Sequence, residues 1–167
     1  MKFSIFQFFS RFFSKLRTKS FLTYDVTPSY IRRPWVAERI YDTFSNTKLI
    51  AVLRNPVDKS YSHYYQSEKY GEKRTFDEVV KQEIEDISGW NSELKDNNYF
   101  ATKVENSILA RCFYAEQLST WFKIFSKDQI MIIQSEKLAS NTEDIMNDVF
   151  QFLKLPKFNI PNTKKEL

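Results

Sequence analysis

The sequence predicts an α/β fold in which a parallel sheet is flanked by helices. Two short apolar runs, Lys48–Leu53 and Gln129–Gln134, are typical of strands that are buried on both faces of such a sheet. The first run is followed directly by Asn55-Pro56, a strong helix start with Asn as the cap and Pro in the first helical position. A strand, a short turn and a helix in this order are the signature of α/β architecture.

The length and composition of the chain favour one folded domain. Its 167 residues fit a single hydrophobic core, and 42% apolar and 17% aromatic residues supply ample material to bury. This composition argues against intrinsic disorder. We assign the domain to residues 23–160, between a basic amphipathic segment at 1–22 and a tail at 161–167.

The positive charge of the chain is local. The net charge is +4, but five lysines and arginines lie within the first nineteen residues, where there is no acidic residue. They are Lys2, Arg11, Lys15, Arg17 and Lys19. Removing these five charges from +4 leaves −1 on the remainder, which therefore lacks the domain-wide basic face of a nucleic-acid-binding protein. We expect no nucleic-acid partner.

The scarcity of cysteine and histidine excludes several kinds of site. Cys112 is the only cysteine, so the chain can form no intrachain disulfide and no cysteine-based metal site. His63 is the only histidine, which leaves a Cys/His zinc site or a Ser-His-Asp triad with little support. We expect no metal.

The first 22 residues are predicted to form an amphipathic helix. Their apolar positions Ile5, Phe9, Phe12, Phe13 and Leu16 fall at helical spacing. Arg11 and Lys15 interrupt the apolar stretch, so a transmembrane span is not expected, and no small-residue cleavage site marks a signal peptide. The helix either packs on the domain core or lies on a membrane surface through residues 1–19. A soluble cytoplasmic or peripheral membrane location is therefore favoured.

A turn and two helices are expected around the first strand. The proline-containing stretch Tyr24–Tyr30 predicts the turn. Pro34 then opens a helix with an apolar face that extends to Phe44. After the strand, the helix that begins at Pro56 is expected to run to about Lys69.

Capping boxes mark two later helices. Thr75–Glu78 has the first box, and its helix ends before the polar stretch Ser88–Asn98, which is predicted to be a loop. Apolar positions from Val104 to Phe125 predict one long helix. After the second strand, Ser140–Glu143 fits another capping box and begins the last helix.

Arg54 and Ser62 are the candidate ligand-binding residues. Arg54 ends the first strand, and ligands of open α/β sheets bind outside the carboxyl ends of the strands. Ser62 lies eight residues later, about two turns into the next helix. A guanidinium matches a phosphate bidentately and a hydroxyl adds a donor, so a phosphate site is one interpretation. A surface or salt-bridge role for Arg54 is the other.

Several segments, in order, resemble one family. Leu53–Tyr64, which reads Leu-Arg-Asn-Pro-Val-Asp-Lys-Ser-Tyr-Ser-His-Tyr, resembles the 3′-phosphate-binding motif of sulfotransferases that use 3′-phosphoadenosine 5′-phosphosulfate (PAPS). Thr27–Tyr30 resembles the Thr-Pro-Ser-Tyr block of heparan-sulfate-type and bacterial carbohydrate sulfotransferases. Further similar segments are Tyr114–Leu118 with Trp121, Gln134–Leu138 and Phe150–Pro156. Together they cover about residues 24–156, which makes the resemblance more specific than any one motif.

The resemblance implies transfer of a sulfuryl group from PAPS, without a metal, to a hydroxyl or amine of a carbohydrate or another small acceptor. Arg54 and Ser62 would hold the 3′-phosphate of the nucleotide. Asp25 stands where the family has its proposed general base, a Glu two residues before the Thr of the Thr-Pro-Ser-Tyr block. Alternatively, Asp25 braces its own turn. His63 could face an acceptor sugar, but a single histidine on a helix more often packs or lies at the surface, so we leave it out of the catalytic set. Tyr61 and Tyr64 are assigned to the core or the rim.

The chain departs from the family on the 5′ side of the nucleotide. The family places a Lys-x-Gly-Thr-Thr loop around the 5′-phosphosulfate, and glycine lets such a loop approach the phosphate. This chain contains no such sequence, and its only glycines are Gly71 and Gly89. Thr18-Lys19-Ser20 does not replace this loop. The family's later basic motif, a Lys-Gly-Arg-like segment after the last helix, is also not found, and Lys164-Lys165 is a poor substitute for it. The P-loop-like sheet is thus expected to be incomplete, without its first strand and 5′-phosphosulfate loop.

Three hypotheses follow from the sequence. The first is a PAPS-dependent sulfotransferase. The second is an inactive or truncated sulfotransferase-like domain that at most binds adenosine 3′,5′-bisphosphate. The third is a peripheral membrane protein that docks through its N-terminal helix.

Overall fold

A computed structural model of the chain describes residues 23–88 and 107–158. The predictions for the N-terminal amphipathic helix and its membrane contact, for nearly all of the loop at 88–98 and for the tail lie outside the described residues. In chain order the elements are η1 (Tyr30–Arg32), α2 (Pro34–Thr43), β1 (Leu49–Leu53), α3 (Pro56–Lys69), α4 (Phe76–Ser88), η3 (Ala110–Cys112), α6 (Tyr114–Ile124), η4 (Lys127–Gln129), β2 (Ile130–Gln134), α7 (Ser135–Ser140) and α8 (Thr142–Phe152). Within this part of the chain, no helix combines the length and hydrophobicity needed to cross a membrane.

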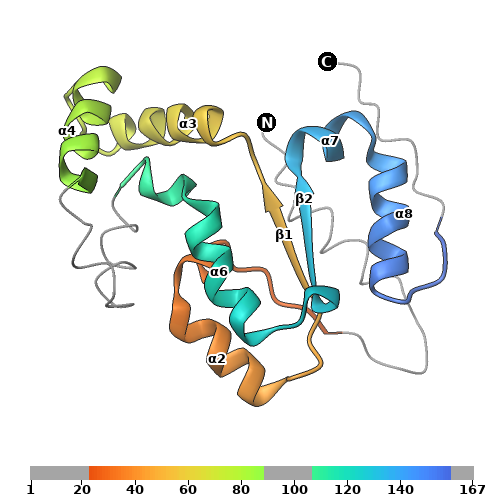
Figure 1. The fold of residues 1–167 in the computed structure, drawn as a ribbon. Helices are drawn as coiled ribbons and strands as arrows, with labels where there is room; N and C mark the ends of the chain where they lie inside the picture. Colours follow the sequence, from red (N-terminus) through yellow and green to blue (C-terminus); the bar gives the residue numbers. More distant parts are fainter. Residues whose placement is uncertain (1–22, 89–106, 159–167) are drawn as a thin grey trace.

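The two predicted strands form a parallel pair. Leu49 of β1 lies opposite Ile130 of β2, and Leu53 lies opposite Gln134. Parallel strands require a crossover connection, which helices usually provide. Here the connection includes α3, α4 and α6, and both strands point toward the side of the molecule on which β1 leads into α3 (Figure 1). The predicted α/β class with a parallel sheet is confirmed.

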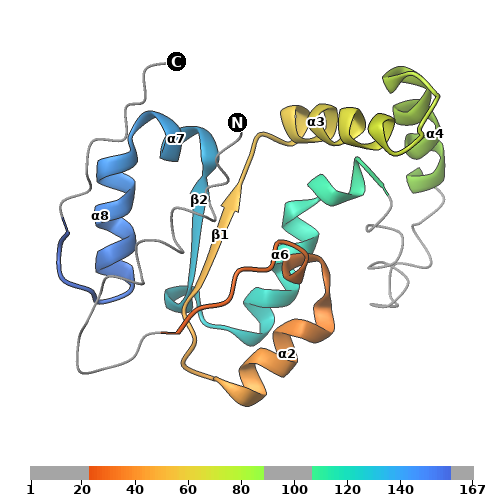
Figure 2. The same ribbon diagram turned by 180° about the vertical axis from the view of Figure 1, so that it is seen from behind.

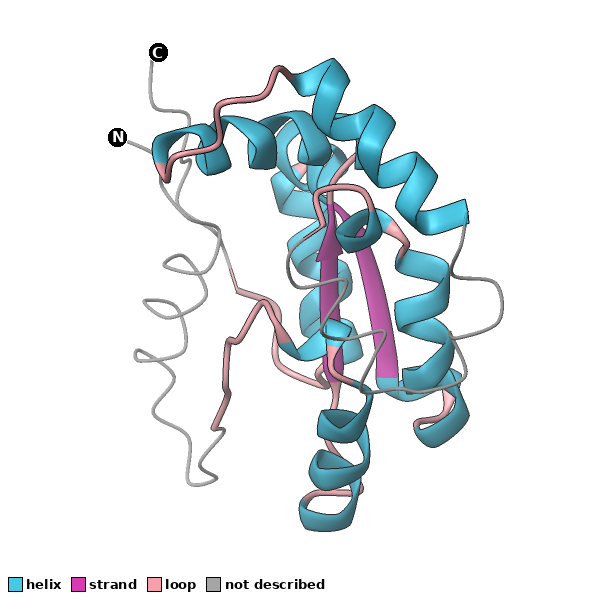
Figure 3. Ribbon diagram, turned by 90° about the vertical axis from the view of Figure 1, so that its left-hand side faces the viewer, coloured by secondary structure: helices cyan, strands magenta, loops and turns pink. Residues whose placement is uncertain are grey.

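Helices cover both faces of the strand pair, as Figures 1, 2 and 3 show. On one face, α7 and α8 form a cluster with Ile133 of β2, and Ile50 and Val52 of β1 pack against it; its members are Ile133, Leu138, Met146, Val149 and Phe150. On the other face, α2 and α6 form a cluster with Ile130 of β2, and Leu49 packs against it; its members are Ala37, Trp121, Phe125 and Ile130. This division follows from the alternation of side chains along a strand.

The strands are less buried than the sequence predicted. All five side chains of β1 are half-buried, and in β2 only Ile130 and Ile133 are buried. Ile132 is 45% exposed. The physical reason is that α2 and α6 pack on Leu49 and Ile130, at the amino ends of the strands, while Ile132 lies further along the same face.

Two predicted helix starts are confirmed by their hydrogen bonds. At α3, the backbone N–H of Val57 donates to Asn55 Oδ1 at 2.9 Å. At α4, Thr75 N donates to Glu78 Oε2 at 2.7 Å, and Glu78 N donates back to Thr75 Oγ1 at 3.3 Å. These reciprocal bonds are those of a capping box.

Two predictions about helices are wrong. The apolar run that ends at Phe125 is not one helix, because the short η3 turn precedes α6, which begins only at Tyr114. The capping box at Ser140–Glu143 is absent, because the side chain of Asn141, the N-cap residue, makes no capping hydrogen bond to α8. Thr142 Oγ1 donates instead to Leu138 O at 2.8 Å. The predicted start of the last helix near Ser140 or Asn141 is nevertheless confirmed, because Asn141 is the residue before α8, which begins at Thr142.

Gly71 ends α3 through its backbone conformation. Its φ is +105°, and a Cβ added there would meet no atom within 4 Å. The N–H groups of Gly71 and Glu72 donate to Glu68 O and Ser67 O, each at 3.1 Å, which satisfies carbonyl groups of the last helical turn. Only the backbone, not packing, therefore requires glycine at this position.

We predict that Gly71→Ala lowers the free energy of unfolding by about 1 kcal/mol, because an L side chain is strained at positive φ. Gly71→Asn should lower the free energy of unfolding by less, since Asn adopts the left-handed region more readily than Ala does. Urea titrations of the three proteins measure the difference. Equal stabilities of the Gly and Ala proteins would contradict the prediction.

Candidate functional site

The loop that carries Arg54 is held from two sides at the carboxyl end of β1. The backbone N–H of Asn55 donates to Glu136 Oε1 of α7 at 2.8 Å. The hydroxyl of Tyr114 at the start of α6 donates to Arg54 O at 3.0 Å. The backbone on which the Arg54 side chain stands is therefore fixed by residues that follow β2 and that begin α6.

Hydrogen bonding and burial hold Glu136 and Tyr114 in the protonation states that these two hydrogen bonds require at neutral pH. The bond from Asn55 N–H is the largest cause that holds the pKa of Glu136 below its ordinary value, and the Arg54 guanidinium contributes. Burial is the largest cause that raises the pKa of Tyr114 to about 12. Glu136 is thus an ionised acceptor and Tyr114 a protonated donor.

A pocket of about 230 Å³ lies beside this loop and brings the two predicted residues together. It is lined by Arg54, Lys59, Ser62, His63, Gln66, Ile108 and Arg111. Arg54 and Ser62, which the sequence singled out as a pair, are both in its wall. The pocket is therefore the place where these two side chains can contact one ligand.

One face of α3 supplies most of the pocket wall. Lys59, Ser62, His63 and Gln66 are spaced at i, i+3, i+4 and i+7, so they project from the same side of the helix. The helical spacing from Ser62 was the signal that could have identified Lys59 and Gln66 in the sequence. Arg111 comes from η3, outside this helix, and no local pattern pointed to it.

The pocket is positively charged. Arg54, Lys59 and Arg111 line it, and none of the described residues in its wall is acidic. Lys59 Nζ donates to Arg111 O at 3.0 Å and lies 4.6 Å from the ring centroid of Tyr114. Burial is the largest cause that lowers the pKa of Lys59, and Arg32 and Arg111 lower it further. Like charges gathered in a partly desolvated place favour binding of an anion.

His63 belongs to the pocket wall, although it was not among the predicted site residues. Its Nδ1 lies 3.5 Å from Arg111 Nη1. Burial is the largest cause that lowers its pKa, followed by the charge of Arg111. The neutral imidazole therefore dominates at pH 7.

Tyr64 is buried and donates to Arg74 O at 2.8 Å, and Tyr61 is exposed, so the assignment of these tyrosines to packing or the rim is confirmed.

Asp25 is not among the residues that line the pocket. Its exposed carboxylate accepts a hydrogen bond from Thr27 Oγ1, at 3.3 Å to Oδ1 and 3.5 Å to Oδ2. In Figures 1 and 2 the start of the described chain, drawn red, lies at the level of the amino ends of the strands. Asp25 braces its own turn in this structure, and its role as a base stays a prediction.

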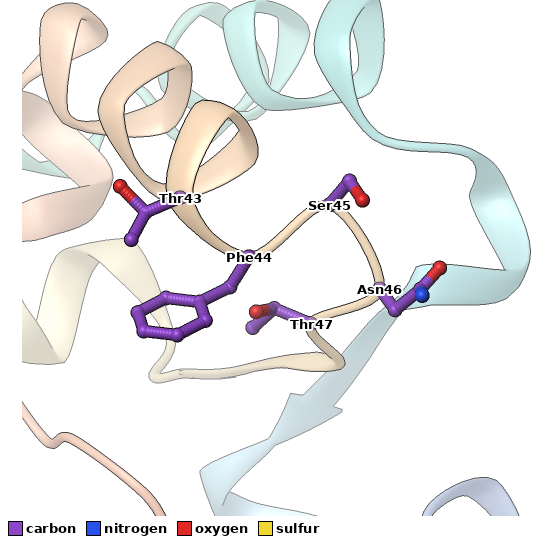
Figure 4. Close-up of a pocket in the computed structure, with 5 residues that line it drawn as sticks. All are labelled: Thr43, Phe44, Ser45, Asn46 and Thr47. Carbon is purple, nitrogen blue, oxygen red and sulfur yellow. The ribbon is translucent and has the colours of Figure 1, made fainter.

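A second hollow lies at the opposite end of the strands. It measures about 410 Å³ and is lined by the consecutive residues Thr43, Phe44, Ser45, Asn46 and Thr47. Figure 4 shows Ser45 and Asn46 directed away from the ring of Phe44, which is 66% exposed. Gln129 Nε2 donates to Ser45 O at 2.7 Å and so braces this turn. With no charged residue in its wall and its place before β1, the hollow lacks the chemistry of the pocket at Arg54.

Comparison with known proteins identifies the family. A model of the "Sulfotransferase domain" family matches residues 37–164, which is most of the chain. The chain belongs to this family. Arg54, Lys59, Ser62 and Arg111 lie within the matched range, whereas Asp25 precedes it.

Individual relatives carry sulfotransferase names. Carbohydrate sulfotransferase 15 of Mus musculus is 29% identical over 130 residues, which cover 73% of this chain and 23% of that protein. The membrane-associated sulfotransferase kil1 of Dictyostelium discoideum is 23% identical, over 77% of this chain and 42% of that protein. Heparan sulfate glucosamine 3-O-sulfotransferase 5 of Mus musculus is 26% identical, over 81% and 36%. The chain thus spans less than half the length of these relatives.

A solved structure shows the same fold. The sulfotransferase from Alicyclobacillus acidocaldarius superposes with a TM-score of 0.60 at 26% sequence identity. The match covers 83% of this chain and 52% of that one. The arrangement of helices around the β1–β2 pair is therefore that of part of a sulfotransferase.

We predict that His63 titrates with a midpoint below its ordinary pKa of 6.5. As the chain has one histidine, its imidazole signal in a proton NMR titration is unambiguous. The unfolded chain binds the proton more readily than the folded chain, so unfolding free energy should fall as the pH drops from 6.5 through the folded midpoint. This part of the pH dependence should be lost in His63→Gln. A midpoint at or above 6.5 would rule out the described surroundings of His63.

Proposed function

We propose that this chain belongs to an enzyme that transfers a sulfuryl group from PAPS to a hydroxyl or amine of a carbohydrate. The observation that carries the proposal is the pocket in which Arg54 and Ser62 meet at the carboxyl end of β1, with two further cations and no acidic residue in its described wall. The fork of an arginine and a hydroxyl suit a phosphate. Relatives whose names specify carbohydrate and heparan sulfate sulfotransferases support the acceptor class.

In the proposed reaction the acceptor oxygen or nitrogen attacks sulfur in line with the bond to the 5′-phosphate. A new bond to sulfur forms while the bond between sulfur and the phosphate oxygen breaks, and adenosine 3′,5′-bisphosphate leaves with the bonding electrons. The proton of the acceptor passes to a base, for which we propose Asp25. As in phosphoryl transfer, most of the catalysis lies in positioning and charge stabilisation. Arg54 and Ser62 contribute by fixing the 3′-phosphate.

A second candidate function is binding of adenosine 3′,5′-bisphosphate without transfer. It rests on the same pocket at Arg54, which would hold the 3′-phosphate of the bisphosphate whether or not a sulfuryl group is transferred. The two functions share the pocket at Arg54 and differ in turnover. Binding and transfer are therefore measured separately.

We predict that Arg54→Ala weakens binding of adenosine 3′,5′-bisphosphate by about tenfold or more, because a charge-assisted hydrogen bond contributes about 1.5–3 kcal/mol. Binding of adenosine 5′-monophosphate, which lacks the 3′-phosphate, should change little. Isothermal titration calorimetry measures both. Arg39→Ala, which removes an exposed arginine of α2, is the matched control. Equal affinity of the wild type and Arg54→Ala for the bisphosphate would refute the phosphate site.

We predict that Asp25→Asn lowers the kcat of sulfuryl transfer by about 10²-fold or more with little change in the KM for PAPS, because the amide cannot accept the proton. Asp25→Glu should keep measurable activity, since it restores the residue of the family. Transfer of radiolabelled sulfate from PAPS to a panel of oligosaccharides measures the rates, with Asp42→Asn on α2 as control. Full activity of Asp25→Asn would refute the role of Asp25 as base and leave it only the role of bracing its turn. A wild-type protein that binds PAPS without turnover would favour the second function.

A further inference from the structure

We propose that Arg111 is a third ligand of the 3′-phosphate, beside Arg54 and Ser62, and that Glu83 is the residue that positions it. The inference rests on the proposed function of the pocket. It concerns a residue that lies 49 positions after Ser62 in the chain and that no motif in the sequence marked.

Arg111 faces the same pocket as the two motif residues. It lines the wall with Arg54 and Ser62, and its Nη1 lies 3.5 Å from Nδ1 of His63, the neighbour of Ser62 on α3. Its positive charge acts on that wall, because it lowers the pKa of both Lys59 and His63. A phosphate bound between Arg54 and Ser62 would therefore lie within the field of Arg111.

The short turn that carries Arg111 is built on the carboxylate of Glu83 in α4. Glu83 Oε2 accepts hydrogen bonds from Ser107 Oγ at 2.7 Å and Leu109 N at 2.9 Å. Glu83 Oε1 accepts from Ile108 N at 2.9 Å. Three donors of one turn thus end on a single side chain, which replaces the helical continuation that the apolar pattern predicted.

Three other contacts fix the same turn. Ala110 N donates to Ser107 Oγ at 2.8 Å, and Ala110 O accepts from the buried Gln117 Nε2 at 3.0 Å. Lys59 Nζ donates to Arg111 O at 3.0 Å. The backbone of Arg111 is therefore held from α3, α4 and α6, so its guanidinium leaves the wall from a fixed point.

Phosphate chemistry accommodates a third donor group. A fork from Arg54 and a hydroxyl from Ser62 leave phosphate oxygens with unused acceptor capacity, which the five N–H donors of a guanidinium can fill. A phosphate dianion also relieves the repulsion among Arg54, Lys59 and Arg111. Lys59 is less suited to this task, since its ammonium already donates to Arg111 O and lies over the ring of Tyr114.

The test compares adenosine 3′,5′-bisphosphate with adenosine 5′-monophosphate by calorimetry. We expect Arg111→Gln to weaken binding of the bisphosphate by about tenfold or more and binding of the monophosphate by less than about twofold. Arg111→Lys, which keeps the charge and loses the fork, should fall between wild type and Arg111→Gln. Arg39→Gln is the matched control. An unchanged ratio of the two affinities in folded Arg111→Gln or, should that variant not fold, in Arg111→Lys would overturn the inference.

Glu83→Gln tests the positioning role. This substitution should reduce the preference for the bisphosphate over the monophosphate. Combined with Arg111→Gln, it should reduce that preference no further than Arg111→Gln alone. Glu85→Gln, an exposed carboxylate-to-amide change in the same helix, is the control. A loss of stability with an unchanged preference would show that Glu83 only supports the fold, and would overturn its positioning role.

The His63 signal supplies a readout on the pocket itself. The bisphosphate should raise the NMR titration midpoint of His63 in the wild type, because an anion then lies beside the imidazole. No rise on saturation with the bisphosphate would contradict the placement of the phosphate near Arg111. A wild type with no preference for the bisphosphate over the monophosphate would instead refute the proposed function, so the two failures are distinguishable.

Discussion

The hydrogen bond between Asn55 N–H and Glu136 Oε1 joins the two strand ends on which the pocket depends. The two residues are 81 positions apart in the chain, and each lies two positions after the last residue of a strand of the parallel pair. The same residue, Asn55, caps α3 with its side chain. Asn55 therefore joins the end of β1 to α7 and also caps the helix that carries Ser62. The parallel register of β1 and β2 brings Asn55 and Glu136 to the same end of the strand pair.

Local chemistry explains which parts of the fold could be predicted from the sequence. Three features depend on residues that are close to one another in the chain, so the sequence pattern predicts them. They are the cap at Asn55, the capping box of Thr75 and Glu78, and the two strands. Arg54 and Ser62, which line one pocket, were singled out for the same reason, because Arg54 follows β1 directly and Ser62 lies in the next helix. Lys59 shares that helix face, and its identification required only the same geometry to be extended by one turn.

The parts that escaped prediction depend on contacts between distant segments. The chain bends before α6 because Glu83, 24 residues upstream of Ser107, binds the donors of that turn, and helical spacing contains no trace of such a partner. Arg111 reaches the pocket through this bend, so it was missed together with it. The exposure of Ile132 was missed because it is decided by how far α2 and α6 extend along the sheet.

The fixed turn before α6 has a thermodynamic consequence for any anion that the pocket binds. Its backbone is ordered by Glu83, Gln117 and Lys59 in the free protein, and the loop at Arg54 is ordered by Glu136 and Tyr114. Ligand binding then costs mainly side-chain entropy, on the order of 0.5–1.5 kcal/mol for each immobilised arginine. The pocket is preorganised, and little of the interaction free energy is lost in ordering the main chain.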